Sequence, residues 1–437
     1  MSYPSMPKAY QLLEQLNLYS QLKHEYDAEG ITPILSRVEE MLGQALADLR
    51  ALPDSAELAG KEPNDLPSIQ QRRPAGTHAL WTSFDAAEYR RRLEGAMIAR
   101  FAGCTLGAPV EFWEVVRMES WAKEIGDVFP PTDYWSAIPE PQNLRYNVSR
   151  CDAYTRNKMD GVPVDDDITY TILGLLIAED HGLDFTVREV GEAWVKYLPY
   201  ACTAEDIALK NLQKGVSAEL AGATDNPYCE WIGADIRADA WGYLAPGLPE
   251  KAAAMAYQDA YISHRRNGIY GEMYFSAAIA AAFTVDHPVA ALELALSEIP
   301  AECAMAKAVR WALDVAPTIT DYRSARTAMD EQFKGMHHVH TINNACLTIW
   351  GLTIGGTDVT RVLAETVAMG MDNDCTAATA GSIVGAVVGI DAIPPHWYAR
   401  FNNTVHTYIN GHPHESLSDL LSRFSMLAAR QFETINA

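Results

Sequence analysis

The sequence lacks paired cysteines. Its seven cysteines all stand apart and none forms a Cys-x-x-Cys spacing; they are Cys104, Cys151, Cys202, Cys229, Cys303, Cys346 and Cys375. An odd number of isolated cysteines is typical of free thiols, and it argues against a disulfide framework. We therefore expect a reducing compartment and a cytoplasmic protein.

Long hydrophobic runs and an excess of basic charge are also missing. A membrane-spanning helix needs about 18 or more apolar residues, and no such run occurs. The first residues lack the basic and apolar regions of a signal peptide. The chain has 34 basic against 57 acidic residues and a net charge of -23. Nucleic acids and anionic membranes would repel such a chain, so we expect neither as a partner.

Strand patterns are scarce, whereas helical periodicity is common. The chain has 437 residues, of which 48% are hydrophobic, so it can bury a sizeable core. No fixed period recurs, which excludes a repeat array. The pattern predicts an all-α fold, with helices over residues 87–102, 168–180, 187–198, 204–214, 249–263, 271–283, 288–297, 304–315, 359–368, 376–390 and 417–432.

The first part of the chain differs from the rest. Residues 1–84 are predicted to form an N-terminal helical extension and linker, and residues 85–437 a main domain. Thr32 and Pro33 are expected to cap and begin a helix that ends before Pro53. Residues 54–76 are polar and contain three prolines, which is typical of a linker or a wrapping strap. Whether the extension packs on the main domain or mediates dimer contact stays open, and so does the oligomeric state.

Two acidic clusters precede predicted helices. Asp165, Asp166 and Asp167 open one helix, and Asp372 and Asp374 stand just before another. A single run of this kind is usually an acidic helix cap, because the helix dipole favours negative charge at its N-terminus. Two such clusters can instead converge on a hard cation, since carboxylate oxygens suit Mg²⁺, Mn²⁺ or Ca²⁺. We expect a metal site here.

The helix predicted after the second cluster is rich in small residues. Gly381, Gly385 and Gly389 recur every four residues. Glycine costs about 1 kcal/mol per site within a helix, so close backbone packing against a neighbour is the expected compensation.

A polar loop, His264–Met273, precedes another helix whose composition predicts that it is wholly buried. Its polar residues either cap that helix or face a ligand. In the second interpretation Asn267 and Tyr270 donate hydrogen bonds to a substrate, and Gly268 and Gly271 allow the backbone to approach it. We select these four residues as substrate-binding candidates.

The histidine-rich segment His337–Asn344 does not have zinc-site spacing. We expect these histidines to be structural or to line a pocket, with His340 as a candidate substrate contact. Upstream, the segment Gly103–Glu111 ends a helix in a glycine turn. Glu111 is the residue in it that is suited to acid–base chemistry.

Together these motifs resemble those of the ADP-ribosylglycohydrolase family. Its first motif, Gly-Asp-Ala-Leu-Gly-x-Pro-x-Glu, is similar to residues 103–111, with Cys104 at the aspartate position. Its Thr-Asp-Asp-Thr motif corresponds to residues 165–168, and its Gly-x-Asp-Thr-Asp-Thr motif to residues 370–375. The resemblance covers roughly residues 85–400. It implies an all-α fold with a two-metal centre that cleaves the glycosidic bond of ADP-ribose.

The resemblance also assigns residues. The implied metal ligands are Asp165, Asp166, Asp167, Asp372 and Asp374, and the implied cofactor is two Mg²⁺ ions, with Mn²⁺ as an alternative. Glu111, Asp166, Asp167 and Asp374 are the catalytic candidates. Cys375 stands at a threonine position, and a thiol is a poor Mg²⁺ ligand. Thr376 or water can replace it, one metal can bind more weakly, or the preferred ion can be softer.

Three functions follow as hypotheses. The first is metal-dependent hydrolysis of an N- or O-ribosyl bond in an ADP-ribosyl adduct, with a small-molecule or protein-linked substrate. The second is a furanosidase or nucleosidase that acts on small ribosyl or furanosyl compounds. It is favoured by the acidic composition, although Arg237, Arg265 and Arg266 are candidates for a pyrophosphate cradle. The third is a non-catalytic binding or structural protein on the same scaffold.

Overall fold

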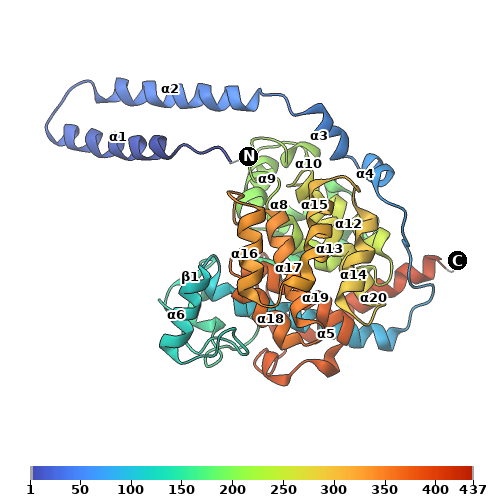
Figure 1. Cartoon of the computed structure of the whole chain (residues 1–437). Coiled ribbons are helices and arrows are strands. Elements are labelled where there is room, and N and C mark those ends of the chain that lie inside the picture. Colours follow the sequence, from blue (N-terminus) through green and yellow to red (C-terminus); the bar gives the residue numbers. More distant parts are fainter. Residues whose placement is uncertain (1–2, 436–437) are drawn as a thin grey trace. The chain divides into compact units, whose positions relative to one another are not determined.

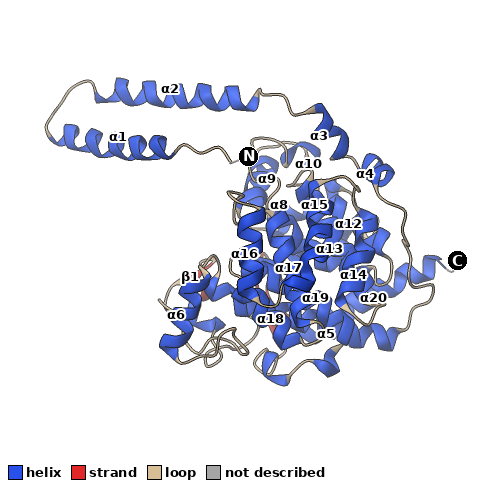
Figure 2. Cartoon of the chain, viewed as in Figure 1, coloured by secondary structure: helices blue, strands red, loops and turns tan. Residues whose placement is uncertain are grey.

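The structure is a computed structural model that describes residues 3–435. Within this range the chain forms twenty α-helices and two short β-hairpins, so the predicted all-α class is confirmed (Figure 2). The chain divides into two compact units, one ending at Gly60 and the other beginning at Lys61.

The first unit is a helical hairpin of α1 (Pro7–Glu25) and α2 (Ile31–Arg50), followed by the start of the short helix α3 (Ala56–Lys61). The prediction that Thr32 caps α2 is wrong. Gly30 precedes the helix with a φ of 83°, a left-handed conformation that turns the chain before Ile31. No residue of α1 or α2 is buried.

The second unit contains the remaining helices, drawn in Figure 1. They are α4 (Leu66–Arg72), α5 (Ala86–Gly107), α6 (Val115–Ile125), α7 (Asp166–His181), α8 (Val187–Tyr197), α9 (Thr203–Gln213), α10 (Ala218–Ala221), α11 (Ala238–Leu244), α12 (Pro249–Ala260), α13 (Asn267–Ala282), α14 (Pro288–Ala295), α15 (Ala304–Val315), α16 (Tyr322–Gln332), α17 (Thr341–Gly355), α18 (Val359–Ala368), α19 (Asn373–Val388) and α20 (Leu417–Ile435). Each helical segment predicted from the sequence overlaps one of them.

Some helices lie where none was predicted, including α6, α16 and α17. The first turn of α17 contains polar residues, because their side-chain amides donate hydrogen bonds to backbone carbonyls of the preceding loop. Asn343 donates to the carbonyl of His337 over 2.9 Å, and Asn344 to that of His338 over 2.8 Å. Because the helix begins with polar residues, the periodicity of apolar residues did not predict it.

Helices α5 and α19 pack backbone to backbone at the centre of this unit. A Cβ atom on Gly381 would lie 2.3 Å from the carbonyl oxygen of Ala99, and one on Gly385 2.3 Å from that of Gly95. The close approach predicted for the glycine helix is confirmed. A Cβ on Gly107 would meet the Cα of Asp374 at 2.5 Å, so the end of α5 lies directly against the start of α19.

Two antiparallel hairpins interrupt the helices. In the first, β1 (Leu144–Arg145) pairs with β2 (Ser149–Arg150). Its turn residues Tyr146 and Asn147 have φ values of 54° and 55°, as in a tight hairpin turn with positive φ at both central positions. The second consists of β3 (Thr404–Ile409) and β4 (His412–Ser416).

Residues 61–84 pack as part of the second unit. The side chain of Glu62 is buried, and its carboxylate accepts hydrogen bonds from Arg266 Nε at 2.9 Å and from the backbone N–H of Ala304 at 2.8 Å. These two donors belong to the starts of α13 and α15. The segment thus ties together two helix N-termini. No helix in residues 3–435 combines the length and the hydropathy that crossing a bilayer requires.

Candidate active site

The structure brings the two acidic clusters together at the N-termini of α7 and α19. Asp165 is the N-cap of α7 and accepts from the backbone N–H of Asp167 at 3.2 Å, while Asp372 is the N-cap residue of α19. Cys375 joins the clusters, because its thiol donates to Asp167 Oδ2 at 3.1 Å. Residues separated by about two hundred positions therefore share one acidic centre.

Four of these aspartates have almost no contact with solvent. The exposed fractions of Asp165, Asp167, Asp372 and Asp374 are 0%, 0%, 3% and 1%. Burial raises the pKa of Asp165 to about 7, and it raises the pKa values of the other three well above the ordinary range. Ionised carboxylates in such a place need a cation nearby, because they have lost their hydration.

The two cysteines at this centre act as neutral thiols. Cys104 lies next to Asp165 and Asp167, and Cys375 next to Asp372 and Asp374. Burial, together with the negative charge of these neighbours, raises the pKa of both thiols well above the ordinary range. A protonated thiol is a weak hydrogen-bond donor and a poor ligand for a hard ion. Cys375 accordingly donates to a carboxylate.

The centre also contains an arginine that the sequence did not single out. Arg145, on the first hairpin, contacts Glu111 Oε2 at 2.6 Å, Asp374 Oδ2 at 2.7 Å and Asp165 Oδ2 at 3.0 Å. The next residue, Tyr146, donates its hydroxyl to Asp166 Oδ1 at 2.7 Å. The hairpin therefore covers both acidic clusters, and only its tertiary position reveals this.

The aspartate oxygens that Arg145 leaves free fit a divalent ion. Asp372 Oδ1 and Asp374 Oδ1 are buried without a hydrogen-bond partner. Buried unpartnered oxygens are costly, and a hard cation, which prefers oxygen ligands, would compensate for that cost. The residues of the two clusters can hold such an ion.

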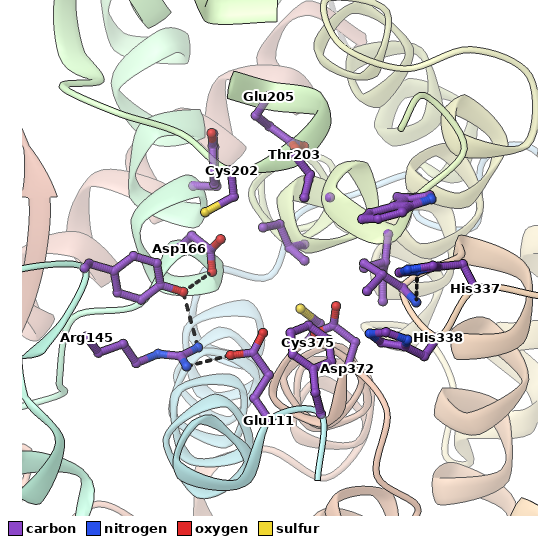
Figure 3. A pocket seen from close by; sticks show the side chains of 18 of the residues that line it. Glu111, Arg145, Asp166, Cys202, Thr203, Glu205, His337, His338, Asp372 and Cys375 are labelled. Atoms are coloured by element: carbon purple, nitrogen blue, oxygen red, sulfur yellow. Dashed lines mark hydrogen bonds and ion pairs between the residues drawn. The ribbon is translucent and has the colours of Figure 1, made fainter. Parts of the chain in front are cut away.

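A cavity of about 530 Å³ opens onto this centre. Figure 3 shows Glu111, Arg145, Asp166, Asp372 and Cys375 on one side of it. Its size and its mixture of apolar walls with a few polar groups are typical of a small-molecule site. Of the predicted catalytic residues, Glu111 and Asp166 line the cavity, whereas Asp167 and Asp374 lie behind its wall.

One wall of the cavity is aromatic. The rings of Trp231 and His337 stack at 4.2 Å with an interplanar angle of 15°, and His337 stacks on His338 at 4.3 Å. Phe112 meets His338 edge-on at 5.1 Å. Burial lowers the pKa of both histidines, so the rings are neutral near pH 7. A neutral aromatic wall of this kind suits contact with a planar heterocycle.

Glu205 is a functional candidate that the sequence analysis missed. It lies in α9, lines the cavity, and appears across it from Glu111 and Asp372 in Figure 3. Burial raises its pKa to about 7, although Arg237 contacts its Oε1 at 2.6 Å. A carboxyl group that holds a proton near neutral pH can act as a general acid. The sequence around it resembles an ordinary acidic first turn of a helix, so no local signal marks it.

The predicted substrate contacts of the 264–273 loop receive no support from the geometry. Asn267, Gly268, Tyr270 and Gly271 are buried in α13 and do not line the cavity. Asn267 accepts from the backbone N–H of Met305 at 2.9 Å, and the Tyr270 hydroxyl donates to the carbonyl of Pro63. Both glycines allow close packing, since a Cβ on Gly271 would lie 2.1 Å from Asp235 Oδ1 and one on Gly268 2.4 Å from the Cys229 carbonyl oxygen. The structure gives these residues packing roles.

His340 also lies outside the cavity lining. It is the N-cap of α17, where its ring accepts from the backbone N–H of Ile342 at 3.2 Å. Burial lowers its pKa to about 4. Its neighbours His337 and His338 are the histidines that face the cavity.

The three arginines considered for a pyrophosphate cradle are engaged elsewhere. Arg237 is buried with Glu205, Asp259 and Glu272. Arg265 donates to backbone carbonyls, and Arg266 pairs with Glu62. None of them lines the cavity. Among the described residues that do, Arg145 is the sole arginine or lysine, and it already faces three carboxylates.

Comparisons with known proteins agree with this fold. The family model described as ADP-ribosylglycohydrolase matches residues 85–432. A solved structure of an "ADP-ribosylglycohydrolase-related protein complex" is 17% identical, with a TM-score of 0.50 over 79% of this chain and 99% of that one. At this identity the structural match concerns the fold alone. The curated proteins contain no match.

Proposed function

The chain belongs to the ADP-ribosylglycohydrolase family and is therefore a glycohydrolase; from this premise we propose that it hydrolyses a ribosyl bond at a divalent-metal centre. The observation that carries the proposal is the acidic centre at the cavity wall. Asp372 has a buried, unpartnered oxygen there, and Asp166 lines the same cavity. Asp165, Asp166, Asp167, Asp372 and Asp374 are the residues available to hold Mg²⁺ or Mn²⁺. A bound divalent ion supplies a binding point for sugar hydroxyls and lowers the pKa of water.

The residues of the chain divide the remaining work between two sides of the cavity. Hydrolysis at an anomeric carbon passes through an oxocarbenium-like state, which requires a proton for the leaving group and a base for the attacking water. Glu205 holds a proton up to about pH 7 and is placed to donate it. The carboxylate of Glu111, across the cavity from Glu205, or that of Asp166 on the side wall is placed to accept the proton of the water (Figure 3).

The aromatic wall orients the substrate. Contact of a planar heterocycle with this wall of Trp231, His337 and His338 contributes binding energy that is independent of charge. It leaves the ribosyl group free to reach the acidic side of the cavity. The family membership supports an ADP-ribosyl adduct as the substrate.

A second substrate class, nucleosides and other small ribosyl compounds, is favoured by the charge of the cavity. Four carboxylates line it, from Glu111, Asp166, Glu205 and Asp372, against Arg145 as the sole arginine or lysine among the described lining residues. A pyrophosphate brings two negative charges into this field without an arginine or lysine side chain that is free to meet them. A neutral riboside avoids that repulsion.

A direct competition assay tests the proposal. The full chain, supplied with Mg²⁺ or Mn²⁺, is assayed for ribose or ADP-ribose release from an ADP-ribosyl-arginine adduct and from a panel of nucleosides. We expect turnover that chelation abolishes and that Asp167→Ala and Asp372→Ala each abolish, with the circular-dichroism spectrum unchanged. Inhibition by ADP-ribose but not by free nucleosides supports the adduct, and the reverse supports the riboside. Turnover that survives chelation and both substitutions contradicts the metal-dependent mechanism.

A further inference from the structure

The first hairpin places a permanent positive charge where the family resemblance implies a metal. The guanidinium of Arg145 has five N–H donors. Its Nε donates to Asp165 at 3.0 Å, its Nη1 to Glu111 at 2.6 Å and to the Ala108 carbonyl at 3.2 Å, and its Nη2 to Asp374 at 2.7 Å and to the Tyr146 hydroxyl at 3.2 Å. Every donor has a partner.

This arrangement is a built site for a guanidinium. Arg145 bridges both acidic clusters, because Asp165 caps α7 and Asp374 belongs to the first turn of α19. The hairpin turn holds the next residue, Tyr146, against Asp166. The side chain of Arg145 is 16% exposed, so solvent competes little for these bonds.

A divalent ion cannot use the same oxygens. Mg²⁺ and Mn²⁺ require carboxylate oxygens at about 2.0–2.3 Å, in directions that the guanidinium N–H groups now occupy at Asp165 Oδ2 and Asp374 Oδ2. An ion bound there would also lie within roughly 4 Å of the guanidinium carbon, where like charges repel strongly in a buried place. The ion and Arg145 therefore exclude one another.

Two other aspartate oxygens, which Arg145 does not contact, can hold a cation. Asp372 Oδ1 and Asp374 Oδ1 are buried without a partner, and Asp372 lines the cavity. Cys375, in the same cluster, donates its thiol hydrogen to Asp167 Oδ2 at 3.1 Å. No arginine or lysine among the described residues contacts these two free oxygens.

We propose that the Arg145 guanidinium takes the place of one of the two divalent ions, so that this chain holds a single exchangeable ion next to Asp372. The inference rests on the proposed function in placing that ion at the same centre. It goes further by assigning the second positive charge to the polypeptide. Half of the cationic centre is then permanent and independent of metal supply.

Counting bound ions tests this without turnover. The full chain is stripped with a chelator and titrated with Mn²⁺ by calorimetry and by electron paramagnetic resonance. We expect one Mn²⁺ per chain with the six-line signal of an isolated ion. Arg145→Met keeps most of the side-chain volume and removes the charge, and we expect it to bind two Mn²⁺ with the multiline signal of a coupled pair. Arg145→Lys keeps the charge, and we expect this variant to bind one Mn²⁺ per chain, as the native chain does.

The matched control is Arg150→Met on the other strand of the same hairpin. Arg150 is half exposed and pairs with Asp152, so this substitution should leave one ion per chain. An equal number of ions in the native chain and in folded Arg145→Met overturns the inference. If Arg145→Met does not fold, the native spectrum decides, since a coupled pair in the native chain overturns the inference and an isolated ion supports it.

The two proposals fail in different ways. One bound ion without hydrolysis of any ribosyl bond contradicts the proposed function and leaves the role of Arg145 intact. Hydrolysis by a native chain that carries two coupled ions contradicts the role of Arg145 and leaves the proposed function intact.

Discussion

Replacing Glu205 by glutamine should lower activity and raise stability at the same time. The side chain is buried, and its Oε1 accepts from Arg237 at 2.6 Å. Arg237 is shared with Asp259 and Glu272, so its charge is divided among three carboxyl groups. Burial therefore prevails over this pairing and raises the pKa of Glu205 from 4.5 to about 7.

The size of the stability effect follows from that shift. A difference of about 2.5 units corresponds to roughly 3 kcal/mol, at about 1.36 kcal/mol per unit. The folded state binds the proton more tightly, so this group makes the free energy of unfolding fall as the pH rises from 4.5 to 7. Glutamine stands in for the protonated acid at every pH. The free energy of unfolding of Glu205→Gln should therefore equal that of the native chain near pH 4.5. At pH 8 it should exceed the native value by up to about 3 kcal/mol.

The catalytic effect has the opposite sign. Loss of a general acid typically costs about 10²–10⁴-fold in rate. The native kcat/KM should decline above about pH 7, where Glu205 loses its proton. The kcat/KM of Glu205→Gln should be low at every pH and should not show this decline. Asp206→Asn, at the next position of α9, is the control, because Asp206 pairs with Lys210 at the surface.

Two measurements check this prediction, namely denaturation midpoints at pH 4.5 and 8, and kcat/KM profiles between pH 5 and 9. A variant that is destabilised at pH 8 and keeps the native pH profile refutes the reasoning. That result would mean that Glu205 is an ionised structural partner of Arg237.

Three further predictions concern the centre, the wall and the core. Asp372→Ala should abolish turnover and Mn²⁺ binding with an unchanged helical spectrum, whereas the exposed Asp286→Ala should keep both; retained binding in the first variant would contradict the ligand assignment. Trp231→Ala should raise KM for substrates with a planar heterocycle by about tenfold, from the loss of roughly 1.5 kcal/mol of stacking, and leave kcat nearly unchanged; an equal change for substrates without a ring would contradict stacking. Gly381→Leu should destabilise the fold by several kcal/mol, because a Cβ already meets a carbonyl oxygen at 2.3 Å, while Gly43→Ala, with open space around it, should be neutral or slightly stabilising; melting temperatures decide between them.

The sequence by itself determined most of the helices and the two acidic clusters. Apolar residues at helical spacing fix the faces that must be buried, and this pattern is local. The aspartates at the starts of α7 and α19, and the glycines of α19 that require a close neighbour, were visible for the same reason. Each of these features depends only on residues that are close together in the sequence.

Only the tertiary structure decided which side chains share the site. Arg145 reaches carboxylates at positions 111, 165 and 374 through a two-strand hairpin that has no pronounced sequence pattern. Glu205 faces the cavity because α9 packs there, and burial then changes its pKa. Asn267 and Tyr270 are residue types typical of a binding loop, yet in the structure they donate hydrogen bonds to Glu62 and Pro63. Contacts between distant segments depend on how helices pack, and no local pattern records them.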